Sequence, residues 1–530
     1  MMHAQSSPSP HSVDATVTDR RQWMLAGWGC FLLLLGLFLF THPGRIDMLD
    51  GQYRFDVSRN ILDQHGPVLT DPQLTQWPAP KNPKTGTPYS YYTAPASLLP
   101  LPLMALGRLF LGAKVASDRF SFSLVSAFVG ALIAPLLLMF YRRLGVSLKR
   151  SIGWALAFSV TTLWWPFAET IFDQCQHGVV LLAMVIAAFD TARDRRWMAA
   201  LLAGLLGGLL FNYRTPFIFL LPFVPLYWRT EFRKVGVEKR VAFQLNAVYA
   251  GGIGVGVVGF LFYNWIRFGQ PGMPAYYGAV PTLGSPVFGF LTLILSPGKG
   301  VFWFSPPLIL GVAGLVGMLK PYRALAILIV SLSLMHIAEM SCLTFAGGDW
   351  CWGPRYMVPL LPLWALAFPF VSRSVFPKVA VLAVLFLGLV VQVMGNAVDY
   401  HRFFYFRRLS SNFWLDSFAY FKRSQLASRP AEILETVSER NVTRPLVNSN
   451  PTNEATYCPF GPSEKVDPQE WQKQFRIFYL PRPWWGWVSQ VPEEQRPVDP
   501  TLFLIVCCIP TGIGFALLRR ARPKAPPTMA

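Results

Sequence analysis

Charged residues are scarce in this chain, and their scarcity is the first constraint on its class. Asp, Glu, Lys and Arg make up 14% of the 530 residues, whereas 53% are hydrophobic. A soluble domain carries about 25% charged residues, so the composition excludes an ordinary soluble protein and indicates many membrane-spanning segments. Basic residues outnumber acidic ones, with a formal net charge of +19. They cluster in short segments between apolar runs, which is typical of cytoplasmic membrane loops and not of a nucleic-acid surface.

Several chemical motifs are also missing. The seven cysteines define no disulfide framework, and no Cys/His spacing of a metal site occurs. The turn Ser296-Pro-Gly-Lys299-Gly lacks the Gly-x4-Gly-Lys-Ser/Thr spacing of a P-loop, so nucleotide binding is not supported. The glycines of Gly251–Gly256 lie in an apolar run without a preceding strand. They suit close helix packing and not dinucleotide binding.

Apolar runs of spanning or near-spanning length predict an all-α polytopic membrane protein with about 12–14 transmembrane helices. The runs lie at 23–41, 94–112, 119–141, 151–166, 178–192, 197–212, 215–228, 242–264, 300–319, 322–345, 354–371, 376–395 and 500–518. Basic clusters predict the cytoplasmic side; they lie at 20–21, 142–150, 193–196, 229–240, 320–323, 373–378 and 519–524. Both termini are then cytoplasmic, and the loops at 42–93, 167–177, 265–299, 346–353 and 396–499 are extracytoplasmic.

The run at 94–112 conflicts with this orientation. If it crossed the membrane fully, the basic loop at Arg142 would move to the outer side. The run contains Pro95, Pro100, Pro102 and Arg108, so we expect a tilted or re-entrant segment; an overlooked span elsewhere is the alternative.

The same patterns divide the chain into segments. Residues 1–21 form a disordered cytoplasmic terminus, since they are rich in Ser, Pro and small polar residues. Residues 22–395 form the transmembrane module, and 396–499 an extracytoplasmic segment or small cap. A last transmembrane helix follows at 500–518, with a basic cytoplasmic tail at 519–530. The first apolar run is followed by no small-x-small cleavage site, which predicts a retained anchor in a multi-pass plasma-membrane protein.

Acidic residues stand directly after the first span. Asp47 and Asp50 begin a stretch, to Leu62, whose apolar residues recur at helical spacing. This predicts an amphipathic helix on the membrane surface with the two carboxylates at its entrance. Acidic groups next to a membrane are costly without a use; the alternative is that Asp50 only caps the helix.

Two further sets of polar residues fall on the same side. Glu169, Asp173 and His177 follow the fourth run, where they could face Asp50 or hold a divalent ion. Alternatively, Asp173 caps the next helix and Glu169 is solvated.

Four loops each bring a cation to this side, namely Arg214, Arg267, Lys299 and Arg355. Converging cations suit a phosphate, while interfacial anchoring is the alternative for each alone. His336 and Glu339, one turn apart in a span, are interpreted as a structural pair.

Several short stretches resemble the GT-C class of integral-membrane glycosyltransferases, the bacterial enzymes akin to aminoarabinose transferases and protein O-mannosyltransferases. They are Asp50-Gly-Gln-Tyr53 with Ser58-Arg59, Tyr91-Tyr92-Thr-Ala-Pro95, Leu295-Ser-Pro-Gly-Lys299-Gly and Asp349-Trp-Cys-Trp352-Gly-Pro-Arg355. The likeness extends over roughly residues 20–395, chiefly as a helix pattern. It implies a GT-C-like bundle and an inverting transfer of a sugar from a polyprenyl-phosphate donor to a lipid, glycan or protein acceptor at the outer face.

The resemblance also implies roles for individual residues. Asp50 would be the general base, with Asp47 as a second acidic group, because Gly51 stands where such enzymes often have an acidic residue. Lys299, Arg355 and Arg214 would bind the donor phosphate. Substrate contacts are expected from Tyr53, Glu169, Asp173, His177, Asp349 and Trp352. Positioned cations would make a cofactor unnecessary, with a divalent metal as the alternative.

Two other function classes compete with this interpretation. A transporter or flippase for a lipid-linked anion would call for inverted repeats and mid-membrane charges. The sequence shows no repeat and only His336 and Glu339 inside a span. A non-catalytic membrane scaffold would tolerate replacement of Asp50.

Overall fold

The described part of the chain is helical. The computed structural model describes residues 10–46, 48–76, 79–274, 283–344, 346–348, 350–406, 420–438, 480–488, 496 and 498–521. Within these ranges, extended segments pair only as isolated bridges, and eight helices are long and apolar enough to cross a membrane. The predicted all-α polytopic membrane fold is confirmed. The eight candidate spans are fewer than the 12–14 predicted, and Trp197–Tyr213 and Leu308–Met318 are shorter apolar helices in the described part of the chain.

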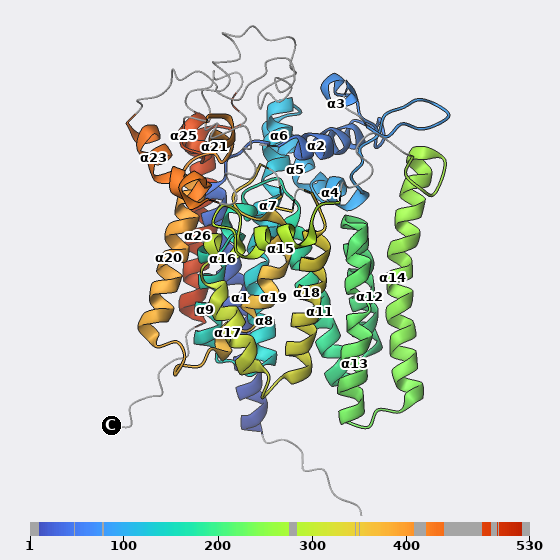
Figure 1. Ribbon diagram of the computed structural model, residues 1–530, viewed down its shortest axis with the longest axis vertical. Coiled ribbons are helices and arrows are strands. Elements are labelled where there is room, and N and C mark those ends of the chain that lie inside the picture. Colours follow the sequence, from blue (N-terminus) through green and yellow to red (C-terminus); the bar gives the residue numbers. More distant parts are fainter. Residues whose placement is uncertain are drawn as a thin grey trace, which may run out of the picture.

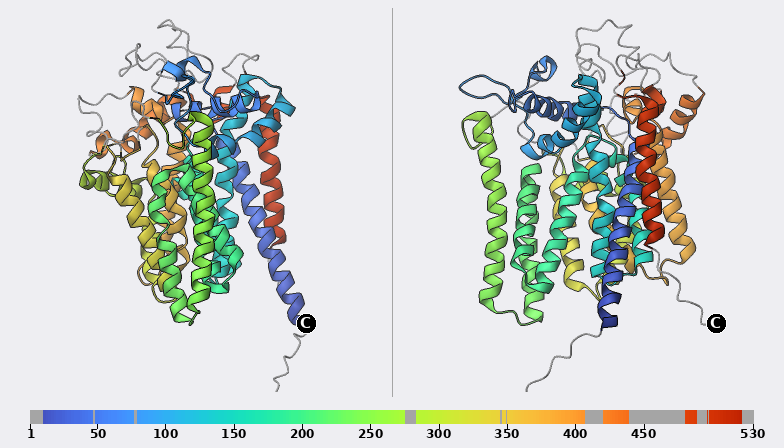
Figure 2. Two further views of the ribbon diagram at one scale, coloured as in Figure 1. Left: turned by 90° about the vertical axis from the view of Figure 1, so that its right-hand side faces the viewer. Right: turned by 180° about the vertical axis from the view of Figure 1, so that it is seen from behind.

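Loops and short helices collect at one end of an upright helix bundle (Figure 1). We call it the loop end; it holds α2 (Leu49–Leu62) and α3 (Pro72–Gln76). Helix α1 (Pro10–Thr41) rises to it from the far end, and α26 (Pro500–Arg520) packs beside α1 on its way back (Figure 2). The start of α1 and the end of α26 therefore lie at the same end of the bundle, as the basic clusters predict.

The run at 94–112 stays at the loop end. It has the length and apolarity of a span, but it forms α4 (Ala94–Leu98) and α5 (Leu101–Leu111), which pack on α2 and on α6 (Val115–Ser123) (Figure 1). Proline removes a backbone donor and breaks a helix, which explains the division near Pro100. The chain then descends through α6, α7 (Val125–Ala131) and α8 (Ile133–Arg143). Arg142 and Arg143 thus reach the far end, the end at which α1 starts and α26 ends (Figure 1, Figure 2).

The rest of the chain runs back and forth between the two ends. The elements in order are α9 (Leu148–Thr161), α10 (Trp164–Ala168), α11 (Gln174–Asp194), α12 (Trp197–Tyr213), η1 (Thr215–Leu220), α13 (Phe223–Lys234), α14 (Lys239–Phe268), α15 (Pro286–Ile294), α16 (Val301–Phe304), α17 (Leu308–Met318), α18 (Arg323–Ser341), η2 (Arg355–Leu360), α19 (Leu361–Ala365), η3 (Phe368–Phe370), α20 (Lys378–Ala397), α21 (His401–Phe406), η4 (Phe421–Arg423), α23 (Gln425–Val437) and α25 (Trp484–Trp487).

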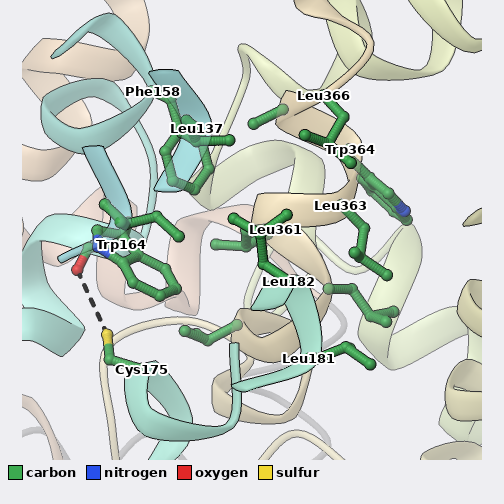
Figure 3. Close-up of a cluster of buried hydrophobic side chains, with 14 of the residues drawn as sticks. Leu137, Phe158, Trp164, Cys175, Leu181, Leu182, Leu361, Leu363, Trp364 and Leu366 are labelled. Carbon is green, nitrogen blue, oxygen red and sulfur yellow. Dashed lines mark hydrogen bonds between the residues drawn. The ribbon is translucent and has the colours of Figure 1, made fainter. Parts of the chain in front are cut away.

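Large apolar side chains fill the centre of the bundle (Figure 3). Trp164 of α10 lies among side chains of α8, α9, α11 and α19, and it is fully buried. Its indole Nε1 donates to the carbonyl of Gly130 at 2.9 Å, so the buried polar atom is satisfied. This core fixes α10, and with it the loop of residues 169–173 that follows at the loop end.

Glycines bring α12 and α14 into close contact. A Cβ at Gly252 or Gly256 would collide with the backbone of α12 at Gly204 and Gly208, whereas one at Gly254 would meet nothing within 4 Å. Small residues on one face let two backbones approach closely. The predicted packing role is therefore confirmed for Gly252 and Gly256.

Candidate active site

The predicted amphipathic helix is present as α2, and Asp50 lies in its first turn. Met48 is the N-cap residue of α2, so capping of this helix does not explain Asp50, and that alternative is wrong. Gly51 packs on Ile171, whose side chain takes the place that a Cβ at position 51 would need. An acidic residue at this position would displace Ile171, so Gly51 is what lets α2 approach the loop of residues 169–173.

Asp50 and Arg355 form an ion pair at the loop end. Arg355 Nη1 lies 3.2 Å from Asp50 Oδ2, although the two residues are 305 positions apart. The side chains of Asp50 and Arg355 are 23% and 11% exposed. Arg355 Nη2 also donates to the Tyr356 hydroxyl at 3.2 Å, and the ring of Phe172 covers the guanidinium. A carboxylate and a cation predicted to share a substrate are thus in contact, at a position that solvent reaches.

Arg214 approaches the same place from the end of α12. Its guanidinium carbon lies 4.7 Å from the centre of the Tyr356 ring, and that of Arg355 lies 5.1 Å from the same ring. The electron-rich ring face attracts both cations. His336 supports this arrangement, since its Nε2 lies 2.8 Å from the Tyr356 carbonyl oxygen, and Glu339 lies 4.0 Å from its other nitrogen. This geometry agrees with the structural interpretation of the His336–Glu339 pair.

A buried charge network links α2 to the start of α11. Arg54 Nε donates to the Asp50 carbonyl at 3.1 Å, and its Nη1 lies 3.6 Å from Asp173 Oδ2. His177 Nε2 is also 3.6 Å from that oxygen. Burial alone would raise the pKa of Asp173, but Arg54 and His177 outweigh it and hold the pKa well below its usual range. Asp173 therefore stays ionised, and it ties His177 to the helix that carries Asp50.

Lys299 and Arg267 hold backbone near the site. Lys299 is fully buried, and its Nζ donates to the carbonyls of Cys351 (2.7 Å) and Gly353 (3.1 Å). Arg267 is buried too, and its Nη1 donates to the carbonyls of Ser90 and Tyr92. Of the four predicted cations, Arg214 and Arg355 thus lie together, while Lys299 and Arg267 fix the segments that carry Arg355 and Tyr92.

Three of the predicted substrate contacts are buried against protein groups other than Asp50 and Arg355. Tyr53 packs on Tyr91, and its hydroxyl donates to the Leu74 carbonyl. Trp352 lies on Phe304 under the guanidinium of Arg429. Glu169 is buried, so the solvated alternative is wrong: it pairs with Arg482 at 3.3 Å and accepts from Trp165 Nε1 and Thr41 Oγ1.

Two predicted site residues, Asp47 and Asp349, lie outside the described residues. Among the residues that the structure does describe, no three His, Cys, Asp or Glu side chains are grouped as a metal site requires.

No individual role was predicted for Arg54, Tyr92 or Tyr356. Arg54 follows Asp50 by one helical turn, a spacing at which two side chains share one helix face, so the pattern could have indicated it. Tyr92 stacks under the Arg54 guanidinium at 4.5 Å, and burial raises the pKa of its hydroxyl well above the usual range. Nothing local to Tyr92 or Tyr356 signals these contacts, because they depend on how distant loops meet.

Comparisons with known proteins bear on the fold. No family model and no curated protein matches the chain. Two crystal structures of ArnT from Cupriavidus metallidurans are similar to it. The one bound to undecaprenyl phosphate has 12% sequence identity and a TM-score of 0.46, covering 94% of this chain and 78% of that chain. The apo structure has 13% identity and a TM-score of 0.43, covering 97% and 78%. A likeness at this identity concerns the fold alone.

Proposed function

We propose that this chain is an inverting glycosyltransferase that moves a sugar from a polyprenyl-phosphate donor to an acceptor hydroxyl at the outer face of the membrane. The observation that carries the proposal is the contact between Asp50 and Arg355, with Arg214 on the same Tyr356 ring. A carboxylate for the acceptor and two cations for the donor phosphate stand within one small, partly exposed region.

Asp50 acts as the general base. Its carboxylate takes the proton from the acceptor hydroxyl while the hydroxyl oxygen attacks the anomeric carbon. The bond from that carbon to the phosphate oxygen breaks, and its electron pair leaves with the polyprenyl phosphate. Attack from the side opposite the leaving group inverts the configuration at the anomeric carbon.

Arg355 and Arg214 bind the donor phosphate and stabilise the charge that it gains as the bond breaks. When the phosphate arrives, it replaces Asp50 as the partner of Arg355 and releases the carboxylate for its role as base. To bind the phosphate directly, the Lys299 amine would have to give up its hydrogen bonds to the carbonyls of Cys351 and Gly353. We therefore assign Lys299 to holding the loop that leads to Arg355.

Asp173 and His177 orient the acceptor beside Asp50, because Arg54 connects both to α2. Two arginines supply positive charge at the phosphate, so the reaction needs no metal ion. Transfer should accordingly persist when divalent ions are chelated.

Sugar transfer by membranes that contain the Asp50→Asn variant tests the proposal. The amide keeps the shape of the side chain and removes its basicity, so transfer from polyprenyl-phosphate sugars should fall about 10²- to 10⁴-fold. The matched control is Asp63→Asn at the other end of α2, where the carboxylate pairs with Arg108 at 2.7 Å. At equal expression, the control should keep most of the activity.

Each other outcome points elsewhere. Equal transfer by both variants would move the base to another residue, with Asp47 next. If the wild type transfers no sugar from any donor but moves a lipid-linked anion across vesicles, the chain is a transporter. If the chain shows neither sugar transfer nor transport, the non-catalytic scaffold is favoured.

A further inference from the structure

A short stretch after α20 lies between the two loops that carry the candidate site. It comprises residues 398–404, including the start of α21. Asp399, His401 and Phe404 are buried. The stretch contacts the loop before α2 on one side and the loop before Arg355 on the other, so it can set how those loops meet.

Asp399 holds both the loop before α2 and the imidazole of His401. Its Oδ2 accepts from Arg45 Nη2 at 2.5 Å, and its Oδ1 lies 2.8 Å from His401 Nδ1. The backbone N–H of His401 also donates to Oδ1, at 2.9 Å. Burial would raise the pKa of Asp399, but His401 and Arg45 outweigh it and keep the pKa well below its usual range. Because the carboxylate can only accept, Nδ1 of His401 carries a proton.

The other nitrogen of His401 reaches the start of α2. Nε2 lies 2.9 Å from Sδ of Met48, so the imidazole and the thioether are in direct contact. Met48 is the N-cap residue of α2, two positions before Asp50. Arg45 and Met48 are thus both held by the Asp399–His401 pair, which anchors the entry to α2 on either side of Ile46.

The same stretch contacts the loop that leads to Arg355. Trp350 stacks on Phe404 with ring centres 5.3 Å apart and planes 5° from parallel, and its edge meets His401. The Lys299 amine lies 5.5 Å from the centre of the Phe404 ring. The position of His401 is therefore linked to both partners of the Asp50–Arg355 pair.

We propose that His401 is a positioning residue: through Met48 it fixes the first turn of α2, and so it holds Asp50 in place against Arg355. The positional part stands on the contacts above, whereas its effect on catalysis rests on the proposed function. Misplacement of a reacting group by about 1 Å can cost about 10²-fold in rate, so a displaced first turn should lower kcat more than it changes KM for the donor.

Two substitutions remove the Met48 contact from opposite sides. His401→Asn keeps a donor near the position of Nδ1 for Asp399 and loses the reach to Met48. Met48→Leu keeps the apolar volume and removes the sulfur. The control is Arg402→Gln in the same stretch, whose side chain bonds Thr436 and Glu435 of α23 at 2.6 Å each.

Amide hydrogen exchange of the first turn of α2, measured on the full chain in lipid nanodiscs, is the first readout, because it does not require activity. Exchange there should be faster in His401→Asn and in Met48→Leu, and unchanged in Arg402→Gln. The kcat for sugar transfer should fall about 10- to 100-fold in the first two variants. The double variant should be no worse than either single one, because both remove one shared contact.

Unchanged exchange in both test variants, or the same change in Arg402→Gln, would overturn the proposal. Faster exchange with an unaltered kcat would overturn its catalytic part. Faster exchange in a chain whose wild type transfers no sugar would support the positioning contact and refute the proposed function instead.

Discussion

A buried ion pair between Glu169 and Arg482 joins the segment before α26 to the bundle, and removing it shows how much this contact stabilises the fold. Arg482 Nη1 lies 3.3 Å from Glu169 Oε2, with side chains 1% and 0% exposed. Its Nη1 also donates to Asn396 Oδ1 at 2.9 Å. Arg482→Met keeps most of the apolar stem and removes the guanidinium. Among the described residues, the Glu169 carboxylate then retains the donors Trp165 Nε1 and Thr41 Oγ1.

Removing one partner of a buried ion pair costs about 3–5 kcal/mol, because the other charge stays buried without compensation. Burial already raises the pKa of Glu169 to about 8, against the opposing effect of Arg482. The carboxyl can therefore take up a proton at neutral pH, which removes the buried charge and leaves an incompletely bonded polar group. We accordingly expect a loss below this range, about 1–3 kcal/mol. The double variant Glu169→Gln with Arg482→Met, which replaces both partners, should recover most of the lost free energy of unfolding.

The free energy of unfolding is measured by denaturant titration in detergent, with tryptophan fluorescence as the signal. The chain has 18 tryptophans, so the signal follows unfolding of the whole chain. The backbone N–H of Trp484 donates to the His42 carbonyl, which docks the segment of Arg482 on the end of α1. The control is Arg193→Met, which breaks an exposed pair with Asp194 at the far end. Such pairs are worth about 0–1 kcal/mol.

Two results would refute this reasoning. If Arg482→Met matches the Arg193→Met control within error, the pair does not hold the segment. Alternatively, the double variant could lose as much as Arg482→Met alone, which would mean that lost packing and not an uncompensated charge explains the effect.

Three further predictions follow from the same structure. Arg355→Lys keeps the charge but loses the fork that contacts both Asp50 and Tyr356, so transfer should fall clearly in the membrane assay; full activity would exclude a bidentate role. Gly256→Leu should separate α12 from α14 and lower the unfolding midpoint, whereas Gly254→Leu, at an open position, should not. Because the pKa of Glu169 rises from 4.5 to about 8 on folding, its contribution to stability is complete below about pH 4.5 and is lost as pH rises through about 8. Unfolding midpoints across this range should show that slope in the wild type and not in Glu169→Gln.

Local patterns made much of the fold predictable. Span length, helical periodicity and the placement of basic clusters depend on neighbouring residues, so the helical membrane fold, the common end for both termini and α2 could be predicted. The prolines near Pro100 likewise indicated a tilted or re-entrant segment at 94–112. Asp50 was recognisable because a carboxylate beside a membrane span is costly without a function.

Which charged groups meet was decided only by the tertiary structure. The sequence by itself placed Asp50, Arg214, Lys299 and Arg355 on one side of the bundle, since each follows or precedes an apolar run. It did not distinguish Arg355, which reaches Asp50 across 305 positions, from Lys299, whose amine is bonded to two carbonyls inside the protein. The physical reason is that a buried cation takes the nearest acceptors that packing supplies, and those acceptors come from segments distant in the chain.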